Sequence, residues 1–487
     1  MADLIQNNAK YEQWRNSHNF NNCKLKRKNY GEFLADYITG EQDGFVLNLN
    51  GSWGTGKTEF LKRFYSYLLV KEHPVVYINS WESDFSKEPL TVITSELLSQ
   101  FEKFNSGIGS EETTKRVKQL CGKALKAALV GVAGFTSAKI LNDSNIGMET
   151  IKQMIESDSE NFTKQLTKEY TEQIEAIHGI RKSLGQLAEV LQKNYGAKLP
   201  AVILVDELDR CRPTHAIEML EVIKHFFTTD NFVFVIATDT EQLSHSIKSV
   251  YGAEFDSNQY LKRFFDRKVS LPEPDLEHYI SATSKGFTNY SSLSLFPLIN
   301  QGNLEKEVNS IIAKLASAFK LKIRDVDQLF SKMHSCLRSI CVIKEGTEKK
   351  QIVNIAALII GLIEQDGNFE PYENRNDSSH TYTPPINKDI EFGPDLNINL
   401  YIEKNMQCVV TMEVSTQDPW GRNITQQELP NPRDLRNIME SNSSAELQNF
   451  IGSLSTNINN YKRAPEQAKY WMWSDLKKII ELAGNIE

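Results

Sequence analysis

Short apolar runs separated by amphipathic segments mark the first 275 residues of the chain. The runs are rich in Val, Ile, Leu and Phe and lie at 44–49, 75–79, 201–205, 232–237 and 268–271. Apolar runs of this length without alternation are typical of strands that are buried on both faces of a parallel sheet. Segments with helical spacing follow them at 57–70, 213–227 and 241–250. The pattern predicts an α/β domain built on a parallel sheet.

Residues 106–198 interrupt this alternation. Apolar residues spaced by three and four positions, as in a coiled-coil seam, are Ile177, Ile180, Leu184, Leu187 and Leu191. The apolar run 127–138 would span about 18 Å as a helix, whereas the core of a bilayer is roughly 30 Å thick. We therefore predict a helical insertion without a membrane-spanning segment, in which 127–138 packs against protein or rests on a membrane surface.

Beyond Pro274 the pattern becomes mainly helical. Helices are predicted at 304–320, 324–341, 350–364 and 465–482, a linker at 366–395, and a small hairpin from 397–402 and 408–414. Trp471 and Trp473 lie in the last of these helices, where we expect them to pack in a core. The predicted domains are a core of 1–105 and 199–275, an insertion of 106–198, a helical domain of 276–365 and a C-terminal region of 366–487.

Composition narrows the class of protein. The 487 residues are 40% apolar and 24% charged, with a net charge of −8, as in an ordinary globular protein. Because acidic residues outnumber basic ones, the overall charge does not favour binding of nucleic acid over the whole surface. Six cysteines without a CxxC pair favour a reducing compartment and argue against disulfides or a zinc site. The first twenty residues lack the apolar stretch of a secretory signal, so we expect a cytoplasmic protein.

A glycine-rich turn is the first candidate for chemistry. GSWGTGKT at 51–58 fits G-x4-GK[ST], the P-loop or Walker A motif, and it lies after a predicted strand and before a predicted helix. In such a motif the backbone N–H groups would surround phosphate oxygens, Lys57 would add positive charge at the β- and γ-phosphates, and the Thr58 hydroxyl would bind Mg²⁺. The predicted nucleotide-binding residues are Gly51, Ser52, Trp53, Gly54, Thr55, Gly56, Lys57, Thr58 and Glu59.

Two carboxylates form the second candidate. The apolar run 202–205 ends in Asp206 and Glu207, the pattern of a Walker B strand. At the carboxyl end of a strand, Asp206 would reach the Mg²⁺ ion and Glu207 would polarise the attacking water. The alternative is an acidic pair that caps the next helix. The strand at 75–79 lies between the two motifs in the sequence, which is typical of the additional-strand class of P-loop NTPases.

Five stretches, two of which contain these motifs, together carry a family resemblance. DELDRCRP at 206–213, followed by HAIEMLEVIKHFF, closely resembles the Walker B region of the KAP family of P-loop NTPases. The stretches LNGSWGTGKTEFL, INSWESD, FVIATDT and QYLKRFFDRKVSLP agree with it, so the resemblance covers roughly 25–275. It implies an ATP-binding protein, mostly of bacteria, and some members exclude bacteriophage. Many members carry transmembrane helices between the two motifs, whereas this chain has no spanning segment there.

The resemblance also suggests roles for residues around the motifs. Thr238 and Asp239 end the fourth strand, where related NTPases place a polar residue that senses the γ-phosphate. Lys262, Arg263 and Arg267 are candidates for a cation that stabilises the transition state, in the same chain or from a neighbour; the alternative is a solvated helix face.

Neighbouring residues have more than one interpretation. Asp209 and Arg210 would pair across a subunit boundary or form an ion pair beside the sheet. Cys211 is expected to be a buried packing residue rather than a redox centre, and His215 a surface or packing residue rather than a ligand. The basic cluster at 24–28 is expected to be a solvated face or a contact with an anion.

These inferences combine into one functional expectation. The chain would bind and hydrolyse Mg-ATP to drive or time a conformational or assembly change, in a homo-oligomer or with a partner protein of the same system. A role in bacterial anti-phage defence is what the resemblance implies. The alternatives are a nucleotide-dependent switch or scaffold with little hydrolysis, and a protein that acts on nucleic acid through its C-terminal region, where we recognise no nuclease motif.

Overall fold

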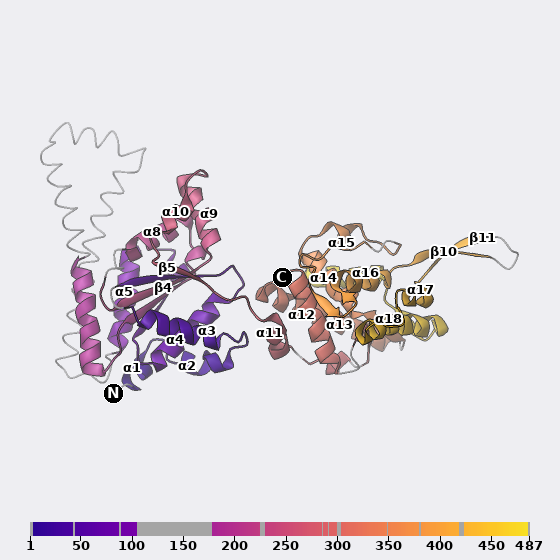
Figure 1. Ribbon diagram of the computed structural model, residues 1–487, viewed down its shortest axis with the longest axis horizontal. Helices are drawn as coiled ribbons and strands as arrows, with labels where there is room; N and C mark the ends of the chain where they lie inside the picture. Colours follow the sequence, from indigo (N-terminus) through magenta and orange to yellow (C-terminus); the bar gives the residue numbers. More distant parts are fainter. Residues whose placement is uncertain are drawn as a thin grey trace. The chain divides into compact units, whose positions relative to one another are not determined.

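The computed structural model forms two compact units, Met1–Glu273 and Pro274–Glu487 (Figure 1). It describes residues 3–41, 44–86, 89–104, 178–224, 229–284, 286–290, 292–299, 303–347, 349–378, 381–417 and 423–485. The apolar run 127–138 and most of the predicted insertion lie outside the described residues. Within the described ranges, no helix combines the length and the apolar composition needed to cross a bilayer.

Unit 1 contains a five-stranded, all-parallel sheet in the order β2-β3-β4-β1-β5. The strands are β1 (Phe45–Asn50), β2 (Val75–Asn79), β3 (Ala201–Asp206), β4 (Phe232–Thr238) and β5 (Arg267–Ser270). Every residue of β3 and β4 is buried, which explains why these strands are continuous apolar runs. The predicted α/β class with a parallel sheet is confirmed.

The order of the strands in space differs from their order along the chain. In the sequence, β2 lies between the P-loop and the two carboxylates, but in space it is an edge strand. The strand inserted between β1 and β3 is β4, which pairs with both of them. Strand order depends on hydrogen bonding between distant segments, and the order along the chain does not reveal it.

Helices cover the sheet of unit 1. They are α1 (Asp3–Asn8), α2 (Trp14–Ser17), α3 (Lys28–Thr39), α4 (Lys57–Val70), α5 (Pro89–Phe104), α8 (Pro213–Lys224), α9 (Thr240–Tyr251) and α10 (Ser257–Leu261). Helix α4 packs on β2, β3 and β4. It buries Phe60, Leu61, Phe64 and Leu68, whose spacing places them on one face of a helix.

The C-terminal end of the predicted insertion belongs to this core. A helix over 178–195 buries Ile180, Leu184, Leu187 and Leu191 in the same hydrophobic cluster as the sheet. Their seam-like spacing therefore serves packing within unit 1.

Unit 2 is mainly helical. Its helices are α11 (Leu276–Thr283), α12 (Leu304–Ala318), α13 (Ile323–Thr347), α14 (Ile355–Asp366), α15 (Glu370–Asn374), α16 (Ile398–Gln407), α17 (Pro432–Arg436), α18 (Ala445–Arg463) and α19 (Trp473–Gly484). Three short parallel strands are β6 (Ser294–Phe296), β7 (Lys350–Asn354) and β12 (Ala468–Tyr470), in the order β12-β7-β6. Antiparallel pairs are formed by β8 (Glu391–Gly393) with β9 (Leu396–Asn397) and by β10 (Met412–Gln417) with β11 (Asn423–Glu428).

Three predictions for unit 2 are wrong in detail. The predicted helix at 350–364 is β7 followed by α14, which starts where the Asn354 side chain accepts from the Ala357 N–H. The predicted strand at 397–402 is the start of α16, which the Asn397 side chain caps in the same way. The hairpin is β10–β11, further along the chain. In both helices an asparagine cap decides the local structure, and a short apolar pattern does not reveal it.

The structure does not divide unit 2 at residue 365. One hydrophobic cluster extends from Ile280 to Ala483. Helices α14 and α19 approach so closely that a Cβ on Gly361 would lie 2.6 Å from the Ile480 Cδ1 atom. Trp471 and Trp473 are buried in this core, although Trp471 precedes α19.

Candidate functional site

The turn between β1 and α4 contains the predicted phosphate-binding residues Gly51, Ser52, Trp53, Gly54, Thr55 and Gly56, while Lys57, Thr58 and Glu59 form the first turn of α4. Gly54 and Gly56 have φ values of 79° and 83°, a region that glycine adopts without strain. The first N–H groups of α4 have no acceptor within the helix and carry the positive end of its dipole. The turn therefore has the backbone of an anion site.

Lys57 is held by a counter-ion from the segment after β3. Its Nζ donates to the Gly51 carbonyl at 2.7 Å and to the Asp209 Oδ2 atom at 3.4 Å. The same Oδ2 atom accepts from the Trp53 indole Nε1 at 2.6 Å. The Lys57 and Asp209 side chains are 9% and 2% exposed. Asp209 thus pairs within its own chain, beside the P-loop.

Asp206 lies at the end of β3, next to the start of α4. Its Oδ2 atom accepts from the Tyr77 hydroxyl at 2.8 Å, its Oδ1 atom accepts from the Glu207 N–H at 2.9 Å, and its side chain also hydrogen bonds with Thr58. Burial raises the pKa of the Asp206 carboxyl, although the hydrogen bonds from Tyr77 and Thr58 oppose this shift. The fold therefore brings together Thr58 and Asp206, the two predicted metal ligands.

Glu207 combines an unusual backbone with an ion pair. Its φ of 58° lies in the left-handed region, which is unfavourable for a residue with a side chain by about 1 kcal/mol or more. Its carboxylate accepts from the Arg210 Nη1 atom at 2.9 Å. Arg210 therefore turns back to the carboxylate pair of its own chain.

The end of β4 lies beside the P-loop. The Thr238 carbonyl accepts from the Gly51 N–H at 3.2 Å, and Asp239 accepts from the Trp53 N–H at 3.2 Å while it caps α9. The Thr238 Oγ1 atom is buried, and no described group hydrogen bonds to it. Such an orphaned hydroxyl is costly unless a ligand or water completes it.

The three candidate cations are not brought to the P-loop. Lys262 and Arg263 are exposed and precede β5. Arg267 pairs with Leu47 in the register of β1, three residues before the strand ends at Asn50. That separation is about 10 Å along the strand. These side chains lie towards the amino-terminal edge of the sheet, whereas the P-loop is at the carboxyl-terminal edge.

Two supporting residues did not stand out in the sequence. The Tyr77 hydroxyl binds Asp206 from inside an apolar run. Arg27, one of the predicted solvated cluster, is 3% exposed and donates to the Thr55 carbonyl at 2.8 Å and to the Pro272 carbonyl at 2.7 Å. Burial lowers the pKa of Arg27 to about 10. The expectation of a solvated face is wrong for Arg27, while Lys24, Lys26 and Lys28 are exposed.

Comparison with known protein families gives a match that covers most of unit 1 and the start of unit 2. The model of the KAP family P-loop domain matches residues 27–340, more than half of the chain. The chain belongs to the KAP family. The expected resemblance is thereby confirmed, and the KAP match extends beyond 275, where the sequence motifs end.

The similar proteins are distant. The phage T7 exclusion protein of Escherichia coli (strain K12) is 22% identical over 237 residues, which are 47% of this KAP chain and 30% of that protein. The match therefore spans less than a third of that relative. Among solved structures, a Walker-type ATPase of Pyrococcus abyssi is 14% identical (TM-score 0.32; 73% of this chain, 78% of that one). The ORC2 protein of Aeropyrum pernix is 12% identical, with a TM-score of 0.28, and the match covers 89% of this chain and 94% of that one.

Proposed function

We propose that unit 1 binds Mg-ATP and hydrolyses it, and that hydrolysis drives or times a conformational or assembly change. One observation carries the proposal: the Thr58 side chain hydrogen bonds with Asp206 at the carboxyl-terminal end of β3, and Lys57 and Glu207 are their neighbours in the sequence. Membership of the KAP family supports nucleotide binding by this unit.

The available donors fit a magnesium nucleotide. Mg²⁺ prefers oxygen ligands, and the Thr58 hydroxyl and the Asp206 carboxylate would hold it; when bound, it neutralises charge on the β- and γ-phosphates. The α4 N-terminus and Lys57 would receive the phosphates themselves. The orphaned Thr238 hydroxyl would contact the γ-phosphate or the attacking water, because it is buried at the same edge of the sheet.

Two ion pairs must rearrange in this mechanism. Lys57 turns from Asp209 towards phosphate, and Glu207 leaves Arg210 to orient water as general base. A cation from a neighbouring subunit would complete the site, because Lys262, Arg263 and Arg267 lie far from their own P-loop.

Turnover of the full chain tests this proposal. Lys57→Ala should abolish tight ATP binding. Glu207→Gln should leave binding of a slowly hydrolysed analogue within a few fold while hydrolysis falls by about a hundredfold or more. Glu241→Gln, an exposed acid in the first turn of α9, is the matched control. Tight binding by Lys57→Ala would overturn the site.

The nucleotide switch remains the second candidate, favoured by the pairing of Glu207 with Arg210. In that case the parent chain turns over slowly, and Glu207→Gln hardly changes the rate. Light scattering after gel filtration, with and without the analogue, would show whether binding alone changes assembly.

We further propose that this activity serves bacterial anti-phage defence, in a homo-oligomer or with a partner protein. The support is the similarity to a phage exclusion protein. A phage plating assay in a bacterium that expresses the chain tests it: protection that Lys57→Ala removes supports the proposal, and equal plating with and without the chain contradicts it.

A further inference from the structure

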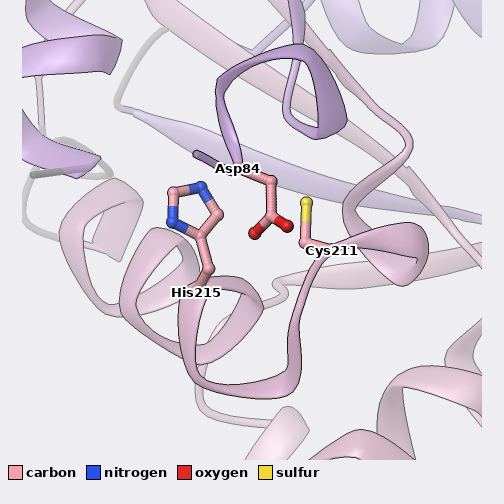
Figure 2. Close-up of side chains that lie close together, drawn as sticks. All are labelled: Asp84, Cys211 and His215. Atoms are coloured by element: carbon pink, nitrogen blue, oxygen red, sulfur yellow. The ribbon is translucent and has the colours of Figure 1, made fainter. Parts of the chain in front are cut away.

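Three side chains with metal-binding atoms converge beside the Glu207 segment (Figure 2). Asp84 follows the 3-10 turn at Trp81–Ser83, Cys211 follows the 3-10 turn at Leu208–Arg210, and His215 lies in the first turn of α8. One ligand atom from each residue lies within 4.8 Å of the others. The cluster therefore joins the loop after β2 to the segment after β3.

The histidine is arranged as a metal ligand usually is. His215 is 2% exposed, and its ring makes a backbone hydrogen bond with Ser86. Its Nε2 atom has no hydrogen-bond partner among the described residues. Metal-binding histidines typically hydrogen bond through one ring nitrogen and bind the ion through the other. A buried nitrogen without a partner is costly, and a bound cation would remove that cost.

The carboxylate is held in position by a neighbour. The Arg212 N–H and Nε donate to the Asp84 Oδ1 and Oδ2 atoms, both at 3.2 Å, and the Arg212 Nη2 donates to the Asp84 carbonyl. These bonds restrict the carboxylate without using all of its lone pairs, since each oxygen accepts more than one bond. Arg212 therefore acts as a positioning residue for Asp84.

We propose that Asp84, Cys211 and His215 bind a Zn²⁺ ion. A mixed set of sulfur, nitrogen and oxygen donors is what Zn²⁺ prefers, and three protein ligands leave a fourth position for water. Zinc bonds of about 2.0–2.3 Å place tetrahedral ligands roughly 3.3–3.8 Å apart, so the side chains would need to close by at most about 1.5 Å on binding. The ion would fasten the loop after β2 to the segment that carries Glu207 and Arg210.

Binding also changes the state of the thiol. Without a metal the Cys211 thiol donates to the Glu207 carbonyl, and burial, with the nearby carboxylates Asp84, Asp209 and Glu207, raises its pKa to about 12. Zn²⁺ binds the thiolate, so the thiol releases one proton per ion. Metal affinity should therefore fall as the pH is lowered.

Cobalt is a direct probe, because a Co²⁺–thiolate bond gives a charge-transfer band in the near ultraviolet. The full chain without nucleotide should bind one Co²⁺ with this band, and Zn²⁺ should displace it. Cys211→Ser should lose the band, whereas Cys341→Ser, at a partly buried thiol of unit 2, should keep it. Absence of the band in the parent, or its survival in Cys211→Ser, overturns the proposal.

A second set of measurements distinguishes the loss of a metal ligand from misfolding of the variants. Zn²⁺ should raise the melting temperature of the parent, since it binds only the folded site. His215→Gln and Asp84→Asn should weaken Co²⁺ binding by about tenfold or more while their circular dichroism matches the parent. Asp206→Asn should keep the thiolate band, which separates this ion from the magnesium site. Unchanged affinity in folded His215→Gln contradicts the assignment, whatever the fate of the ATPase proposal.

Discussion

Replacing Asp209 with asparagine should tighten the binding of ATP. Asparagine keeps the shape of the side chain and an acceptor oxygen for the Trp53 indole N–H. It removes the negative charge that lies 3.4 Å from the Lys57 Nζ atom. In the parent, Lys57 must give up this counter-ion to reach phosphate, and the carboxylate also repels the phosphates.

The ion-pair distance sets the size of the effect. Two unit charges 3.4 Å apart attract by roughly 5 kcal/mol at an effective dielectric constant of about 20. Both side chains are almost fully buried, so the loss of hydration offsets a large part of that energy. A net gain of about 1–3 kcal/mol remains, which corresponds to an affinity for ATP about 5- to 150-fold higher.

Calorimetric titration with a slowly hydrolysed ATP analogue and Mg²⁺ measures this change. The exposed Trp53 ring offers a fluorescence readout at the same place, because its indole N–H bonds to Asp209. A double-mutant cycle isolates the contribution of the Lys57 ion pair: in a Lys57→Ala background, Asp209→Asn should bring only the smaller gain that comes from removing the repulsion of the phosphates. Unchanged or weaker binding by a variant that melts like the parent would refute the reasoning.

Three further predictions follow from buried charges. Arg27→Ala leaves the carbonyls of Thr55 and Pro272 without this donor, so the free energy of unfolding of unit 1 should fall by about 2–4 kcal/mol. Thermal melting measures this loss, with Lys28→Ala at the exposed neighbouring residue as control. Equal melting temperatures of the two variants would contradict the prediction. Burial raises the pKa of Asp206 in the folded chain, so folding is favoured where this group is protonated and loses stability as the pH rises through the folded-state pKa. Without Mg²⁺, Asp206→Asn should therefore melt above the parent at neutral pH while it loses ATP turnover, and identical melting–pH profiles would count against the shift. In unit 2, Arg375→Ala leaves the buried Glu364 carboxylate without its counter-ion, because the two side chains are 0% exposed and lie 2.8 Å apart. Urea unfolding should show a loss of about 3–5 kcal/mol, with the exposed Arg433→Ala as control, and a loss below about 1 kcal/mol would be inconsistent with an unpaired buried charge.

Much of unit 1 could be predicted because its signals are local. The helix predicted at 57–70 is α4 with the same bounds, and the five predicted strands are all present. The P-loop is a continuous segment whose glycines, lysine and threonine act through their own backbone turn. Such a site needs no distant partner to be recognised.

Unit 2 was harder to predict for a physical reason. Strands β6, β7 and β12 are short and come from distant parts of the chain, so no segment shows a strand period of its own. Asn354 and Asn397 convert apolar runs into helix starts through a single side-chain bond each. Neither effect appears in a window of hydrophobicity.

The sequence by itself determined the parallel α/β class, the positions of the strands and the segments that carry Lys57, Thr58, Asp206 and Glu207. Only the tertiary structure decided which side chains from other segments contact these four residues. It placed β4 between β1 and β3. It also brought the Asp209 carboxylate to Lys57 and the Arg27 guanidinium to the Thr55 carbonyl of the P-loop. It also assembled Asp84 with Cys211 and His215, although the spacing of the cysteines argued against zinc. The reason is that sheet order and register set distances between residues more than a hundred positions apart, and periodicity describes only neighbours along the chain.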